Sequence, residues 1–189
     1  SWKDTFTIAS FDYSTEYPHD AYVVSNMETD KAAILLYDLK TDKPIKKLIE
    51  QDNYDAGGMA LSRKRGYELD YFSYQGVKQE IIPVSDYFKK LHARIMTEFP
   101  GYEYSIPDFT DDESKYLVFI QSDKLYGIYY MYDAKKDEFK LLYNLMPQLK
   151  EEDMAEMRPI TFKSRDGITL HGYITLPKAA VNGQKVPLI

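Results

Sequence analysis

Hydrophobic and polar residues alternate in short runs along the first half of the chain. Each run contains several β-branched or aromatic side chains and ends at a cluster of Asp, Asn, Gly or Pro. This pattern is typical of strands that bury one face and are joined by tight turns. It predicts two antiparallel meanders, whose strands are residues 6–13, 22–25, 32–39, 46–50, 59–62, 67–74 and 77–82.

The hydrophobic period changes after residue 85. Apolar side chains now recur at spacings of three and four, as one face of a helix requires, at Phe88, Leu91, Ile95 and Phe99. Ser85 precedes them as a favoured N-cap, and Pro100-Gly101 follows them as a stop signal. We predict one amphipathic helix over residues 86–98, packed against a β unit.

Strand-like runs resume after the helix. Pro147 to Glu156 forms a polar connector with a candidate helical turn, and a final hairpin is centred on Arg165-Asp166-Gly167, a strong turn signal. The predicted strands are residues 116–121, 127–132, 139–143, 160–164 and 169–176.

Two segments about 95 positions apart share a pattern. Tyr22-Val23-Val24 and Leu36-Tyr37-Asp38 reappear as Tyr116-Leu117-Val118 and Met131-Tyr132-Asp133. Propeller blades take about 40 to 50 residues each, so this offset equals two blades and indicates three blade-like units. Because Tyr-rich hairpins resemble one another, the repeat alone leaves a propeller and an unrelated β fold both open.

The stretch from Met157 to Pro177 carries the most specific signal. It reads Met-Arg-Pro-Ile-Thr-Phe-Lys-Ser-Arg-Asp-Gly-Ile-Thr-Leu-His-Gly-Tyr-Ile-Thr-Leu-Pro. This stretch closely resembles the opening of the peptidase domain in bacterial relatives of prolyl oligopeptidase of the acylaminoacyl-peptidase type. Further segments are similar to parts of the same family: Phe99-Pro100-Gly101, Asp108 to Ser114, Tyr130 to Asp133, and Lys185 to Ile189, which resembles the strand before the oxyanion segment.

The resemblance covers most of the chain from residue 20 onward and implies a mainly β fold. The implied fold is a partial β-propeller of about three blade-like antiparallel units, with one inserted amphipathic helix and a C-terminal β-hairpin from a truncated α/β-hydrolase domain. The implied domains are the C-terminal blades over residues 1–149, a linker over 150–157 and the first hydrolase strands over 158–189.

Composition narrows the function classes. The chain has 18 tyrosines and no cysteine. Its formal net charge of −6 argues against non-specific binding to nucleic acid or anionic lipid. No apolar run reaches the roughly 20 residues of a membrane helix, and Ser1-Trp2-Lys3-Asp4 lacks the apolar core of a signal peptide. We expect a soluble protein. Cytoplasm and periplasm both stay open, because a cysteine-free chain fits either one.

A hydrolase of this type needs a serine in a Gly-x-Ser-x-Gly elbow, followed by an acid and a histidine. None of the serines lies in that context, including Ser62, Ser105 and Ser164. The histidines, at positions 19, 92 and 171, read as structural, and no pair of them has metal-site spacing. We predict no catalytic, cofactor-binding or metal-binding residue here, and expect the family's nucleophile, acid, base and oxyanion segment beyond Ile189.

Charged clusters receive a structural interpretation. Asp111-Asp112-Glu113 and Glu151-Glu152-Asp153 lack the alternating spacing and central glycine of a calcium loop, so both are interpreted as solvated turns. Arg63-Lys64-Arg65 is too short to indicate nucleic-acid binding and is interpreted as a charged hairpin tip. Related dipeptidyl peptidases hold a substrate's amino end with a glutamate pair, but Glu151-Glu152 lacks the surrounding motif and does not take that role.

Three functions remain open. The leading one is the substrate-gating propeller part of a serine peptidase that hydrolyses short or acylated peptides, inactive as this chain alone. Its partners would be the rest of the hydrolase domain and short peptide substrates, with self-association through exposed strand edges. The alternative is a propeller-like binding or scaffold module for a protein or carbohydrate. A complete small enzyme is disfavoured, because no nucleophile and base are paired in the sequence.

Overall fold

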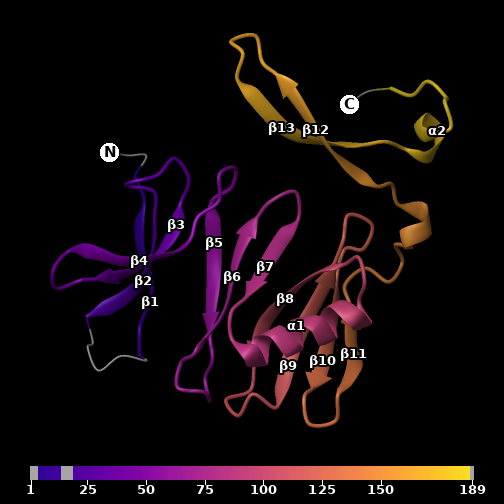
Figure 1. The fold of residues 1–189 in the computed structure, drawn as a ribbon. Helices are drawn as coiled ribbons and strands as arrows, with labels where there is room; N and C mark the ends of the chain where they lie inside the picture. Colours follow the sequence, from indigo (N-terminus) through magenta and orange to yellow (C-terminus); the bar gives the residue numbers. More distant parts are fainter. Residues whose placement is uncertain (1–3, 14–18, 188–189) are drawn as a thin grey trace. The chain divides into compact units, whose positions relative to one another are not determined.

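The computed structural model describes residues 4–13 and 19–187 (Figure 1). Within them the protein is mainly β, with antiparallel sheets and one long helix, as predicted. The chain divides into two compact units. The first runs to Gly101 and also includes Phe109–Lys115, and the second contains Tyr102–Asp108 and the chain from Tyr116 onward. The predicted domain boundaries near residues 150 and 158 stay predictions.

The first unit begins with a four-stranded meander. Its strands lie in chain order, β1 (Phe6–Phe11), β2 (Asp20–Ser25), β3 (Ala33–Asp38) and β4 (Lys43–Ile49). The two central strands pair in continuous register, with Ala21 opposite Tyr37 and Ser25 opposite Ala33. Successive side chains along each strand point to opposite faces of this sheet, so its two faces carry different sets of residues.

One face of the first sheet shares a core with the second sheet. The second sheet consists of β5 (Ala56–Leu61), β6 (Leu69–Gln75) and β7 (Gln79–Pro83). The shared core consists of Ile34, Ile49, Ala56 and Phe72, all at least nine-tenths buried. Partly buried side chains extend it: Val24, Leu48, Met59, Leu69, Tyr74 and Ile82.

Helix α1 (Asp86–Glu98) follows the second sheet and matches the predicted range. The Ser85 hydroxyl accepts a hydrogen bond from the Phe88 amide at 3.0 Å, which is a standard N-cap. Phe88, Leu91 and Ile95 are buried, and the Phe88 ring stacks on Tyr71 of β6 with centroids 4.6 Å apart. The helix therefore packs against a β unit, as its period predicts.

The second unit contains another four-stranded meander, made of β8 (Glu103–Phe109), β9 (Lys115–Gln121), β10 (Ile128–Asp133) and β11 (Glu138–Asn144). The strand β8 was not predicted. Its Pro107 lacks an amide proton, which argues against a central strand, but β8 lies at the edge of the sheet, where proline is tolerated. With β8 included, both four-stranded sheets have the same strand order.

The two four-stranded sheets repeat one turn. Between β3 and β4, the Tyr37 hydroxyl donates to Asp42 at 2.9 Å, and Asp42 is in the left-handed region with φ 55°. Between β10 and β11, Tyr132 donates to Asp137 at 2.9 Å, and Asp137 also has φ 55°. The second turn lies 95 positions after the first, so the predicted internal repeat is present down to single hydrogen bonds.

The chain ends in the predicted hairpin of β12 (Met157–Lys163) and β13 (Thr169–Thr175). A 3-10 turn (Glu151–Asp153) precedes it, and a short helix α2 (Lys178–Val181) that was not predicted follows it. Most hairpin side chains are exposed. Residues 185–187 form no strand, and the last two residues of the strand expected at 185–189 lie outside the described residues.

Candidate functional site

The candidate serines and histidines lie in separate elements. Ser164 lies in the β12–β13 turn, where its hydroxyl reaches the Asp166 carboxylate and the Ile168 carbonyl oxygen. His171 lies on β13 with its Nδ1 3.5 Å from the Thr161 Oγ1 opposite. Both contacts stay within the hairpin and stabilise it locally.

The other candidate serines and histidines lie in or next to different elements. Ser105 lies in β8, His19 precedes β2, and Ser62 follows β5. His92 is half-buried on α1, and burial lowers the pKa of its imidazole. This half-buried position on the helix fits the structural interpretation. The absence of a catalytic residue from this chain stays a prediction.

The described residues show neither a metal-ligand cluster nor a membrane-spanning helix. Among the described residues, no group of three or more His, Asp or Glu side chains is placed to hold a metal ion. No helix formed by those residues is long and apolar enough to cross a membrane.

The most connected charged site joins two turns of the first unit, the β5–β6 turn and the segment Phe109–Lys115. The Arg65 guanidinium bonds Glu113 and Asp70, and its Nε lies 3.0 Å from the Glu68 carboxylate. The Arg65 guanidinium also lies 4.0 Å over the ring of Tyr87, a cation–π contact. We call Arg65, Glu68, Asp70, Tyr87 and Glu113 the ionic cluster.

The ionic cluster shows that two turn predictions were partly wrong. The interpretation of Asp111-Asp112-Glu113 as a solvated turn is wrong for Glu113, whose side chain is 4% exposed, although it holds for the 98% exposed Asp111. The turn at Arg63-Lys64-Arg65 is likewise more than a charged tip, because Arg65 is 22% exposed and paired with carboxylates. A buried glutamate needs partners, and Arg65 supplies one.

The pKa values reflect competing effects in the cluster. Burial raises the pKa of the Asp70 carboxyl, against the opposing hydrogen bonds from Ser85 and Arg65. Burial disfavours the charged Arg65, but the hydrogen bonds and charges of Asp70, Glu68 and Glu113 outweigh it and raise the Arg65 pKa. Asp70 also accepts from the Ser85 hydroxyl at 2.6 Å. The N-cap of α1 is therefore part of the same network.

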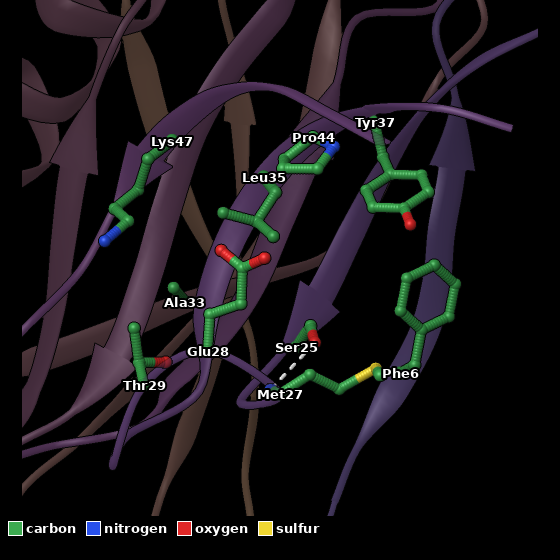
Figure 2. Close-up of a pocket in the computed structure, with 10 residues that line it drawn as sticks. All are labelled: Phe6, Ser25, Met27, Glu28, Thr29, Ala33, Leu35, Tyr37, Pro44 and Lys47. Carbon is green, nitrogen blue, oxygen red and sulfur yellow. Dashed lines mark hydrogen bonds between the residues drawn. The ribbon is translucent and has the colours of Figure 1, made fainter. Parts of the chain in front are cut away.

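A second feature is a hollow of about 150 Å³ in the first unit, next to β1–β4 (Figure 2). Its lining is mainly apolar, and the Phe6 and Tyr37 rings meet edge to face there, 5.1 Å apart. Glu28 and Lys47 are its charged lining residues. The other lining residues drawn in Figure 2 are Ser25, Met27, Thr29, Ala33, Leu35 and Pro44.

The residues at the hollow differ in size from their counterparts in the internal repeat. Three of its lining residues are small or compact, namely Ser25, Ala33 and Pro44. At 95 positions further along, the third sheet carries larger side chains, namely Ile120, Ile128 and Phe139. The smaller side chains of the first sheet leave room for the hollow.

The fold and the repeated hairpin place the chain among propeller-type β proteins, and comparison with solved structures agrees. Prolyl oligopeptidase B from Galerina marginata, bound to a 35-residue hydrolysis and macrocyclization substrate, matches with a TM-score of 0.58 and 16% identity, over 93% of this chain and 24% of that one. A prolyl endopeptidase matches with a TM-score of 0.55 and 12% identity over the same shares. At these identities the matches show the fold.

The sequence comparison points the same way. The chain is 23% identical over 159 residues to dipeptidyl aminopeptidase BIII from Pseudoxanthomonas mexicana, which covers 84% of this chain and 23% of that protein. No family model matches. The chain thus resembles prolyl oligopeptidase-type peptidases in sequence and fold, as predicted, and spans about a quarter of their length.

Proposed function

We propose that this chain is the substrate-gating propeller part of a serine peptidase, together with the first hairpin of its hydrolase domain. The observation that carries the proposal is the match to a prolyl oligopeptidase over 93% of the chain. The catalytic serine, acid and histidine would lie after residue 189 of the longer protein. We expect the propeller of this protein to favour small, flexible peptides over long ones.

The exposed face of the hairpin supports a covering domain. Ile160, Phe162 and Leu170 are each at least 39% exposed. The register pairs Phe162 with Leu170, so these side chains lie on one face of the hairpin. A two-stranded hairpin is at best marginally stable alone in water, so a hydrolase sheet would stabilise it. If nothing covers it, the same face favours self-association.

The substrate class is the finer part of the proposal. Short or N-acylated peptides fit an acylaminoacyl-peptidase relative, and the curated relative is named a dipeptidyl aminopeptidase. The test is the activity of the longer protein on matched substrates with a free amino end, an acetylated amino end, or about thirty residues. We expect cleavage of at least one short substrate and much weaker cleavage of the long one. Equal kcat/KM for short and long substrates would contradict gating.

A binding or scaffold module for a protein or carbohydrate stays the second candidate, because Phe6 and Tyr37 line the hollow next to β1–β4. A reading frame that stops at Ile189 would favour this candidate. A frame that continues into His-Gly-Gly-Pro and Gly-x-Ser-x-Gly would favour the peptidase.

A further inference from the structure

The β5–β6 turn takes a hydrogen-bond acceptor from a distant part of the chain. The amides of Arg63 and Lys64 donate to Glu113 Oε1 at 2.7 and 2.9 Å. Glu113 is about fifty positions further along, in the segment Phe109–Lys115. One buried carboxylate oxygen therefore caps this turn from outside it.

Other turns of the protein are capped by their own first residue. In each, a Ser or Asp side chain accepts the amide two residues ahead, the usual Asx or ST turn. These pairs are Ser25 with Met27 at 3.2 Å, Asp38 with Lys40 at 2.8 Å, Ser122 with Lys124 at 3.1 Å and Asp133 with Lys135 at 3.0 Å.

Ser62 stands at the same position of the β5–β6 turn but makes no such bond. It lies two residues before Lys64 and is 1% exposed. Among the described residues, its Oγ is a buried side-chain atom without a hydrogen-bond partner. A buried hydroxyl in this state costs free energy and requires an explanation. Here the amide that it would accept is already bound by Glu113.

We infer that the Lys64 amide has two alternative caps, the Glu113 carboxylate and the Ser62 hydroxyl. The structure shows the first arrangement, in which Glu113 anchors the segment Phe109–Lys115 to the β5–β6 turn. In the second arrangement the Ser62 side chain rotates to accept the Lys64 amide, and Glu113 is released to solvent. The turn keeps a cap in both, so the anchor opens without unfolding the turn.

The charges allow this exchange. Arg65 keeps Asp70 and Glu68 as partners when Glu113 leaves, so its guanidinium is not left unpaired. Other contacts also hold the anchored segment, among them an exposed pair between Arg63 and Asp111 at 3.5 Å. Arg63 bonds the Phe109 carbonyl oxygen and lies 4.3 Å over the Phe109 ring, and the Tyr87 hydroxyl lies 3.4 Å from the Glu113 carbonyl oxygen. Glu113 can therefore leave the Lys64 amide while Ser62 replaces it as the hydrogen-bond acceptor.

Amide hydrogen exchange at Lys64 in the 189-residue chain tests the inference. Glu113→Ala and Ser62→Ala are made singly and together. In each single variant one cap remains, so we expect exchange at Lys64 within about twofold of the original chain. In the double variant both caps are gone, and exchange should accelerate at least about tenfold, as loss of a half-buried hydrogen bond implies.

Two controls separate the cap from charge and from general loosening. Glu113→Gln keeps a carbonyl oxygen, so combined with Ser62→Ala it should preserve the protection of Lys64. Asp111→Ala removes a 98% exposed carboxylate of the same segment, whose pair with Arg63 at 3.5 Å is solvent-exposed and contributes little, so it should leave exchange at Lys64 unchanged. Fast exchange at Lys64 in Glu113→Ala alone, a Glu113→Ala chain that fails to fold, or additive small effects in the double variant would each overturn the inference.

Discussion

The hairpins β3–β4 and β10–β11 have the same turn in different surroundings. Tyr132 is 7% exposed and stacks on Phe139 with centroids 4.5 Å apart. Tyr37, its counterpart, is half-buried and lines the hollow next to Pro44, which occupies the place of Phe139. The turn is encoded by local residues and repeats faithfully. Burial depends on the neighbouring side chains, which differ, so the two tyrosine rings should contribute differently to stability.

The largest expected effect separates the two tyrosines. Tyr132→Ala removes a buried aromatic side chain and should lower the free energy of unfolding by about 3–5 kcal/mol, whereas Tyr37→Ala should cost less than about 2 kcal/mol. Urea denaturation followed by far-UV circular dichroism measures both. Equal losses would show that burial does not distinguish the two hairpins.

The same contrast can be sharpened on one helix. Leu91→Ala on the buried face of α1 should destabilise the protein by about 2–5 kcal/mol, because it leaves a cavity. Lys89 is 53% exposed and pairs with Asp86, so Lys89→Ala should change stability by no more than about 0.5 kcal/mol. Small, equal effects at both positions would mean that α1 is not docked as described.

The turn itself should respond equally in both sheets. Asp42→Ala and Asp137→Ala each remove the acceptor of a tyrosine hydroxyl and place alanine at a left-handed φ, so each should cost about 1 kcal/mol. Asn at either position keeps an acceptor and tolerates this φ, and serves as the matched control. A much larger loss in one hairpin would show that the turn is not an autonomous local unit.

The smallest expected effect is on titration. The hydrogen bond to Asp42 is the main cause that raises the pKa of the Tyr37 hydroxyl above its ordinary 10.0, so Asp42→Ala should lower it. Because the raised pKa belongs to the folded state, this contribution to stability is present below pH 10 and is lost as the pH rises through the folded pKa. Ultraviolet titration of tyrosine detects the shift. An unchanged titration curve in Asp42→Ala would contradict it.

Local signals in the sequence predicted the elements that depend on them. The helix has its N-cap at Ser85, its apolar period and its stop within a few residues, and the hairpin at Asp166-Gly167 is equally local. The strand β8 was missed because its Pro107 is tolerated only at an edge, and edge position is a property of the whole sheet.

The charged cluster could not be predicted for a related reason. Glu113 and Arg65 are 48 positions apart, and each stands in a polar run that looks like an exposed turn. Their pairing depends on how two turns meet in the folded unit. The hollow could have been suspected from the repeat, because Ser25, Ala33 and Pro44 are smaller than the residues 95 positions later.

The most direct test of the proposed function is labelling with a fluorophosphonate probe, which reacts with activated serines. The account predicts no labelling of the 189-residue chain, and labelling of the longer protein at one serine after residue 189. Replacement of that serine by alanine should abolish the signal. Labelling of the 189-residue chain at a defined serine, such as Ser62, Ser105 or Ser164, would contradict the account.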